Sequence, residues 1–195
     1  MAIGKSTDPL EDGDALHPSL TRLAECAESA LKLPSGGGLV AEAMVDFGRE
    51  TAAWAPNVRF KPGGYTRHLL YRSPSFEVLL LCWDQGLESD LHDHAGQRCW
   101  MAALDGDLEE VRFSRGADAS VQQEGVRRLG NDRPAFIRDE LGLHVVRARP
   151  ASQAVSLHLY AKPVERCGIY CDRTGRSLGA RDLSYDTAAP GAWQQ

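Results

Sequence analysis

The spacing of apolar residues divides the chain into a helical first part and a strand-rich second part. Over residues 20–31 apolar side chains recur every three or four positions, which is typical of one face of an α-helix, and Pro18 suits a first helical turn. A proline, a serine and three glycines at 34–38 interrupt this pattern, and a second one follows over 40–54. We therefore expect two or three N-terminal α-helices within residues 16–56.

From Tyr65 onward the apolar positions fall into short segments of β type that are separated by turn residues. The pair Asp105-Gly106 is the strongest hairpin signal, because both residues tolerate the positive φ angles of a two-residue turn. Many short strands at even spacing predict a sandwich or barrel, and we expect a mainly β fold with a barrel over residues 60–190. The predicted strands cover nine segments: 65–71, 76–83, 99–104, 107–113, 119–123, 133–138, 144–149, 154–160 and 166–171.

Length and composition indicate a single globular domain. The chain has 195 residues, which is enough for one hydrophobic core and short for two, and 43% of its residues are apolar and 25% charged. Because the first segment is polar, we expect residues 1–15 to form a flexible tail and residues 16–195 to form the domain. We predict that the protein is a monomer.

Charge and cysteine usage narrow the partners and the compartment. The net charge is −5 without a basic block, so neither nucleic acid nor a membrane is an expected partner. No apolar run is long enough to span a membrane, and the N-terminus lacks the apolar core of a secretion signal. Five cysteines at irregular spacing are expected to be reduced thiols. We therefore expect a cytoplasmic protein.

The main chemical signal is a pair of histidines, His92 and His94, on either side of Asp93. In a strand, residues i and i+2 point to the same face, so both imidazoles could reach one metal ion. A pair of this kind on its own is more often structural than metal-binding.

The context of the pair resembles the first cupin motif, which Gly86 and Gly106 frame here at the family's spacing. Cys99 stands where most cupins carry a glutamate ligand. A proline and a glycine before His144 loosely match the second cupin motif, and His144 would be the third ligand. Three neutral imidazoles leave the charge of a divalent metal uncompensated, unlike two histidines and a carboxylate. Such a site favours an anionic ligand, and a thiolate is one, because metal coordination deprotonates a thiol.

Several separate stretches resemble the cysteine dioxygenase family of thiol-oxidising cupins. They occur in the family's order and spacing from about residue 47 to 176, and together they are far more specific than any single one. The stretches are Tyr65-Thr66-Arg67, residues 81–99, Leu141-Gly142-Leu143-His144, Ser156-Leu157-His158-Leu159-Tyr160 and Cys171-Asp172-Arg173-Thr174-Gly175.

The resemblance implies a cupin, or jelly-roll, β-barrel that follows the helices and holds one Fe(II) per chain. It implies that L-cysteine and O2 react there to form cysteine sulfinate. His92, His94 and His144 match the family's iron ligands. Arg67 matches the residue that holds the substrate carboxylate, and Tyr65 lines the same pocket. A planar guanidinium is well suited to a carboxylate, so the residue type agrees with this role.

The resemblance also implies a catalytic row on one strand. Tyr160 matches the active-site tyrosine, with His158 and Ser156 as its relay, and Cys99 matches the cysteine that forms a thioether with that tyrosine. The three polar residues of the row alternate with apolar ones, so they share one strand face. Interior polar groups need partners, and this row could satisfy itself.

Structural and functional alternatives remain open from sequence. Cys99 could be a small buried hydrophobe, the row 156–160 could be a core network without chemistry, and Trp83 is expected only to pack in the core. The activity could be that of a 3-mercaptopropionate or other small-thiol dioxygenase. That branch typically carries Gln where Arg67 stands, so the arginine in this sequence favours cysteine as the substrate. A non-catalytic metal-binding cupin and a zinc-dependent isomerase are the alternatives from other classes.

Overall fold

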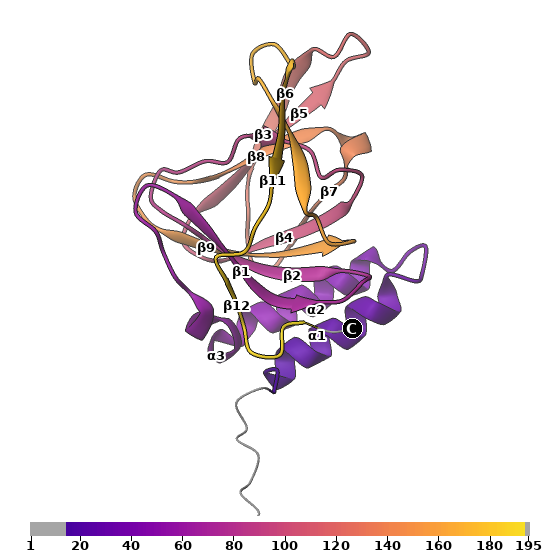
Figure 1. Ribbon diagram of the computed structural model, residues 1–195, viewed down its shortest axis with the longest axis vertical. Coiled ribbons are helices and arrows are strands. Elements are labelled where there is room, and N and C mark those ends of the chain that lie inside the picture. The colour runs from indigo at the N-terminus through magenta and orange to yellow at the C-terminus, as the bar shows by residue number, and fades with distance from the viewer. Residues whose placement is uncertain (1–14, 194–195) are drawn as a thin grey trace, which may run out of the picture.

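The computed structural model describes residues 15–193, and helices precede strands in it as predicted (Figure 1). The predicted tail 1–15 therefore lies, apart from Ala15, outside the described residues. The first helix begins at Pro18, and the buried face of this helix carries the predicted apolar positions. The N-terminal helical elements are α1 (Pro18–Ala30), α2 (Gly37–Arg49), α3 (Thr51–Trp54) and the 3-10 helix η2 (Ala55–Asn57), and a further 3-10 helix, η3 (Asp139–Leu141), lies in the strand-rich part.

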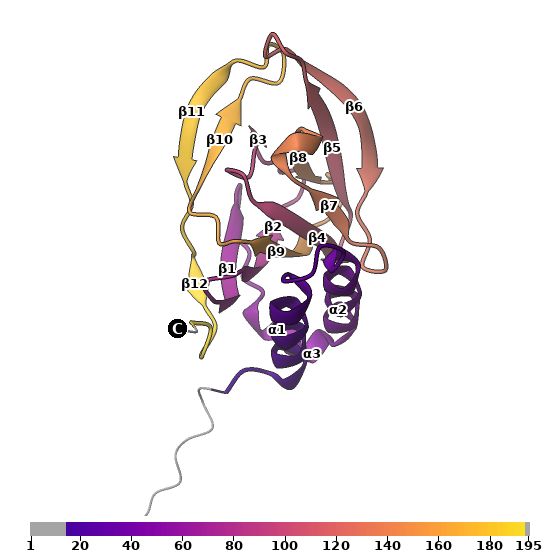
Figure 2. The ribbon, with the colours of Figure 1, turned by 90° about the vertical axis from the view of Figure 1, so that its right-hand side faces the viewer.

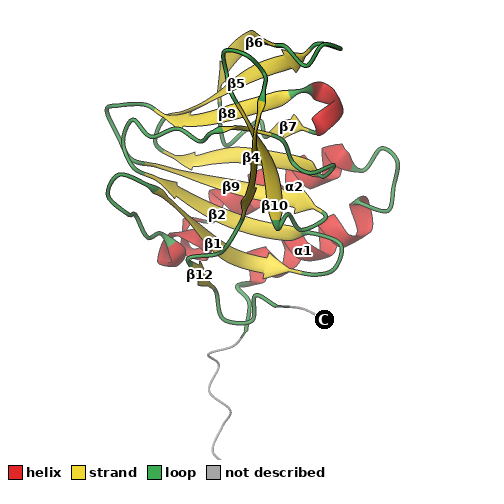
Figure 3. Cartoon of the chain, turned by 45° about the horizontal axis from the view of Figure 1, so that its top comes forward, coloured by secondary structure: helices red, strands yellow, loops and turns green. Residues whose placement is uncertain are grey.

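The strands form two six-stranded sheets (Figure 3). The first has the order β12-β1-β2-β9-β4-β7 and the second the order β11-β10-β3-β8-β5-β6. Among residues 15–193 no hydrogen-bonded ladder joins the two sheets into a closed barrel. The strands are β1 (Tyr65–Arg72), β2 (Glu77–Trp83), β3 (Leu91–His92), β4 (Arg98–Asp105), β5 (Leu108–Arg115), β6 (Val121–Arg128), β7 (Ala135–Ile137), β8 (Leu143–Ala148), β9 (Ala154–Ala161), β10 (Arg166–Tyr170), β11 (Ser177–Asp182) and β12 (Thr187–Ala188).

The first sheet is buried on both faces. Along β2, Leu79 and Leu81 join a core cluster that also contains Val146 of the second sheet. Val78 and Leu80, which alternate with these residues along the strand, belong to a second cluster that contains the apolar faces of α1 and α2. The helices therefore cover the outer face of the first sheet (Figure 2). This double burial explains why β2 after Glu77 is a continuous apolar run and does not alternate.

The mainly β cupin-type fold with N-terminal helices is thus confirmed, with the correction that its two sheets do not close into one barrel. The predicted hairpin at Asp105-Gly106 is wrong, because this turn connects β4 of the first sheet to β5 of the second. The three strands that were not predicted, β3, β11 and β12, are two residues long or fully exposed. Such strands carry no hydrophobic pattern. For the same reason β6, which is mostly polar and exposed, extends beyond the predicted segment 119–123. Within residues 15–193 the structure has no helix that is both long and apolar enough to cross a membrane.

Candidate metal centre

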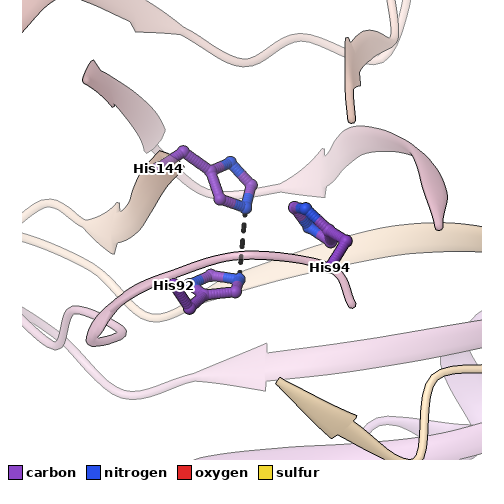
Figure 4. A group of neighbouring side chains, drawn as sticks. All are labelled: His92, His94 and His144. Atoms are coloured by element: carbon purple, nitrogen blue, oxygen red, sulfur yellow. Dashed lines mark hydrogen bonds between the residues drawn. The ribbon is translucent and has the colours of Figure 1, made fainter. Parts of the chain in front are cut away.

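Three imidazoles meet on the inner side of the second sheet (Figure 4). His92 ends β3 and is directly opposite His144 of β8 in the strand register, while His94 lies just beyond β3. The distance between the Nε2 atoms of His92 and His144 is 3.2 Å. One ligand atom from each of the three side chains lies within 4.8 Å of the others. The structure therefore brings all three predicted metal ligands together.

Hydrogen bonds fix the orientation of two of these rings. His92 Nδ1 is 2.9 Å from the carbonyl oxygen of Asp90, and His144 Nδ1 is 3.0 Å from Glu110 Oε1. Both acceptors require a proton on Nδ1, which leaves the Nε2 lone pairs pointing toward each other. Two facing lone pairs repel unless a cation lies near them.

The third ring has unsatisfied polar atoms that a metal would satisfy. His94 is 2% exposed, and neither of its ring nitrogens has a hydrogen-bond partner among residues 15–193. Its nearest carboxylate oxygen, Asp139 Oδ1, is 4.0 Å from Nδ1, which is too long for a hydrogen bond. Because leaving a buried polar atom unpaired is unfavourable, the site fits a bound divalent metal.

Burial also maintains the imidazoles in the form that binds metal. Burial lowers the pKa of His92. It also lowers the pKa values of His94 and His144 well below the usual value for histidine, and repulsion between neighbouring histidines lowers these two values further. Neutral imidazoles at neutral pH need not release a proton before they bind a metal.

A cavity of about 40 Å³ lies beside the three histidines, between the two sheets. A water needs about 10–15 Å³ of such volume, so the space suits a few small groups. The first sheet contributes side chains from β1 and β9 to its wall, and the second sheet contributes the histidines. The predicted substrate and catalytic residues Tyr65, Arg67, His158 and Tyr160 all line it.

Arg67 brings a buried cation to this cavity. It is 7% exposed, and its Nε and Nη2 atoms have no hydrogen-bond partner within the described part of the chain. The guanidinium carbon lies 6.0 Å from the centre of the Tyr160 ring. Asp186 holds the backbone of Arg67 at both ends, because its carboxylate accepts from Arg67 N and its own N–H donates to Arg67 O, each at 2.8 Å. The unpaired guanidinium favours an anionic ligand.

The predicted polar row forms a continuous hydrogen-bonded network. Ser156 Oγ is 2.8 Å from His158 Nε2, and His158 Nδ1 is 3.2 Å from the Tyr160 hydroxyl. Burial lowers the pKa of His158 to about 3 and raises the pKa of Tyr160 well above its usual value. The imidazole is therefore neutral and the phenol protonated at neutral pH. Trp83, expected only as core packing, donates its Nε1–H to Ser156 Oγ at 2.8 Å and stacks on Tyr65.

Because the pKa of His158 is low, we expect the stability of the metal-free protein to depend on pH. The folded pKa is about 3 and the unfolded pKa is about 6.5, so the unfolded chain binds more protons between these values. The stabilisation is complete above pH 6.5 and is lost as the pH falls. We expect the free energy of unfolding of metal-free protein, from urea denaturation, to decrease from pH 6.5 to 4. His158→Gln should reduce that slope by about 1.4 kcal/mol per pH unit. If this variant has the same slope as the unmodified protein, the low pKa does not belong to His158.

Cys99 lies next to Tyr160 across two paired strands. In the register of β4 and β9 the two residues are direct partners, which places their side chains on the same face. Cys99 is fully buried, its Sγ is 4.0 Å from His158 Nδ1, and burial raises the pKa of its thiol. The strand register therefore brings the predicted pair together.

Sequence reasoning missed the carboxylates that support the ligands. Glu110 accepts from His144, and Asp139 accepts from the backbone N–H groups of His94 and Gly96 at 2.8 and 2.6 Å. Asp139 has no sequence signal that points to the histidines. Glu110 has none either, because alternation along β5 puts the apolar Val111 and Phe113 on one face and Glu110 on the more polar one.

Comparison with known proteins places the chain among characterised relatives. The family model described as "Cysteine dioxygenase type I" matches residues 36–173. The chain is 35% identical over 128 residues to cysteine dioxygenase type 1 of Rattus norvegicus, with 64% of each chain covered. It is 33% identical over 136 residues to that of Homo sapiens, with 68% of each covered. The match thus spans a little under two thirds of the length of the rat relative.

Solved structures also match part of the chain, at lower identity. The protein TT1209 from Thermus thermophilus is 21% identical with a TM-score of 0.45, covering 56% of this chain and 94% of that one. An rmlc-like cupin protein from Desulfovibrio desulfuricans is also 21% identical, with a TM-score of 0.42, covering 55% of this chain and 91% of that one. The family model covers well over half of the 195 residues. On that match, the chain belongs to the cysteine dioxygenase type I family.

Proposed function

We propose that this protein is a thiol dioxygenase that oxidises L-cysteine to cysteine sulfinate with O2. His92, His94 and His144 would hold one Fe(II). The observation that carries the proposal is the juxtaposition of three imidazoles, two of them buried and that of His92 partly buried, and one unpaired buried arginine at a single small cavity. Family membership supports the same activity.

The charges in the cavity favour a small ligand that has two negative groups. The three neutral imidazoles leave the charge of a divalent metal uncompensated, which favours a thiolate. Arg67 adds a second positive charge whose buried nitrogens lack partners, which favours a carboxylate. A small amino acid with a thiol offers both a thiolate and a carboxylate. Bound iron would supply the redox chemistry that allows O2 to react with sulfur.

The remaining residues orient the reactants and control protons. The Tyr160 hydroxyl keeps its proton at neutral pH and is available as a hydrogen-bond donor toward the cavity. His158 and Ser156 hold the phenol in one orientation, and Trp83 anchors the far end of the row. The protein's contribution is thus positioning and electrostatics at a water-poor site.

An oxygen-uptake assay tests the proposed activity. Metal-free protein is loaded with Fe(II) under anaerobic conditions and mixed with aerobic solutions of cysteine, 3-mercaptopropionate or cysteamine. We expect cysteine to have the highest kcat/KM and to yield sulfinate with one O2 consumed per thiol. A higher kcat/KM for 3-mercaptopropionate would assign the other small-thiol activity. Iron binding without oxygen uptake on any thiol would indicate a non-catalytic metal-binding protein.

We further expect Cys99 and Tyr160 to become joined by a thioether during aerobic turnover. The bond would form between Cys99 Sγ and the ring carbon beside the Tyr160 hydroxyl, with loss of one hydrogen from each, while O2 accepts the two electrons and two protons. The direct pairing of these residues in adjacent strands supports this expectation. Peptide mapping should find one peptide pair lighter by two hydrogens.

Two variants make this test specific. Cys99→Ser should abolish the linked peptide, whereas Cys82→Ser, which changes a buried thiol on the opposite face of the first sheet, should not. If Cys99 remains fully alkylatable after many turnovers of the unmodified protein, the thioether does not form and Cys99 is a buried thiol only.

A further inference from the structure

A fully buried carboxylate lies directly behind one of the three metal-site histidines. Glu110 of β5 is 0% exposed. Its Oε1 accepts from His144 Nδ1 at 3.0 Å. Its Oε2 accepts from Arg112 Nε at 3.0 Å and also from Arg127 Nε. Every hydrogen bond of this carboxylate is therefore charge-assisted or directed at a candidate metal ligand.

The strand register explains how Glu110 reaches this position. β5 lies between β6 and β8, with Arg112 opposite His144 on one side and Glu110 opposite Arg127 on the other. Residues 110 and 112 share one face of β5 because side chains alternate along a strand. The neighbouring Glu109 points the other way, where it pairs with Arg147 at 2.9 Å.

We propose that Glu110 is a positioning residue that sets the affinity and electronic structure of the metal site through His144. By accepting the Nδ1 proton, Glu110 fixes the imidazole as the tautomer whose Nε2 lone pair is free for the metal. It also brings a negative charge within one hydrogen bond of a ligand in a site whose ligand set has no carboxylate. This inference depends on the metal site of the proposed function.

The two arginines define the alternative role that an experiment must exclude. They offset the desolvation of the carboxylate, so Glu110 could serve only to link β5 to β6. A purely structural Glu110 would affect folding stability and leave metal binding unchanged. A positioning Glu110 changes the metal affinity and the spectrum of the bound metal even where the protein remains folded.

The test compares Glu110→Gln with Glu109→Gln, two carboxylate-to-amide changes at adjacent positions of one strand. Metal-free proteins are titrated with Co(II) against a competing chelator, and the visible absorption of the Co(II) forms is recorded. We expect Glu110→Gln to bind Co(II) about 10–100-fold more weakly, because partners of ligating histidines contribute on that scale. Its absorption bands should shift, while Glu109→Gln should match the unmodified protein in both measurements.

A second pair of variants covers a failure to fold. Glu110→Gln leaves Arg112 and Arg127 without their carboxylate, so Glu110→Gln/Arg127→Gln is made as well and should show the same weakened Co(II) binding. Arg127→Gln alone keeps the His144 contact and should lower the melting temperature without a comparable loss of affinity. Equal Co(II) affinity in the Glu110 variants and the unmodified protein would overturn this proposal and leave the proposed function intact. No Co(II) binding by the unmodified protein would overturn both.

Discussion

We expect His92→Ala, His94→Ala and His144→Ala each to lose stoichiometric iron and all measurable thiol oxidation. The proposed site has three protein ligands, and within residues 15–193 the structure gathers no fourth metal-binding side chain with these imidazoles, so none is placed to replace a missing one. The loss of metal affinity should exceed the roughly 10–100-fold effect of removing a partner of a ligand. Metal analysis of protein loaded anaerobically with Fe(II) gives the iron content, and oxygen uptake gives the activity.

His68→Ala is the matched control for these variants. His68 is as buried as His144, but its ring bonds to Thr187, Thr66 and the carbonyl oxygen of Arg59, away from the metal site. This variant should keep its iron even if its melting temperature falls. Stoichiometric iron in any one of the three ligand variants would remove that histidine from the metal site.

The second large effect is expected for Arg67→Ala with cysteine as substrate. A hydrogen bond to a charged group contributes about 1.5–3 kcal/mol, which corresponds to about a 10- to 150-fold decrease in kcat/KM. Most of the decrease should arise from a higher KM, because the guanidinium binds a carboxylate that does not react. Cysteamine lacks the carboxylate, so its kcat/KM should change much less. Steady-state oxygen uptake with both thiols measures the difference.

Two further variants define the role of Arg67. Arg67→Lys keeps the charge without the planar pair of donors. Its kcat/KM for cysteine should lie between those of Arg67→Ala and the unmodified protein. Arg98→Ala removes an arginine that lies over the Trp100 ring and is not part of the cavity wall. This variant should leave kcat/KM for both substrates unchanged. If cysteine and cysteamine lose activity equally in Arg67→Ala, the arginine has a structural role and does not bind the substrate.

Local patterns were sufficient for the helices, most strands and the three histidines that the structure brings together. Helical spacing and hydrophobic alternation are short-range properties, so 20–31 and 154–160 were predicted with little error. The pair His92-x-His94 is likewise local, and its order relative to the other family-like stretches was sufficient to add His144. The exposed strand β6 was predicted only in part and the exposed strand β11 was missed, because strands without a buried face lack an apolar pattern.

What the sequence by itself determined was therefore the fold class, the three histidines of the candidate metal site and the residues expected around them. Only the tertiary structure decided that two separate sheets, rather than a closed barrel, bring them together. Glu110 and His144 are 34 positions apart, and Asp186 holds the Arg67 backbone from 119 positions away. These contacts depend on strand register and on the path of the C-terminal segment. Both result from burial over the whole chain, and no short stretch of sequence encodes them.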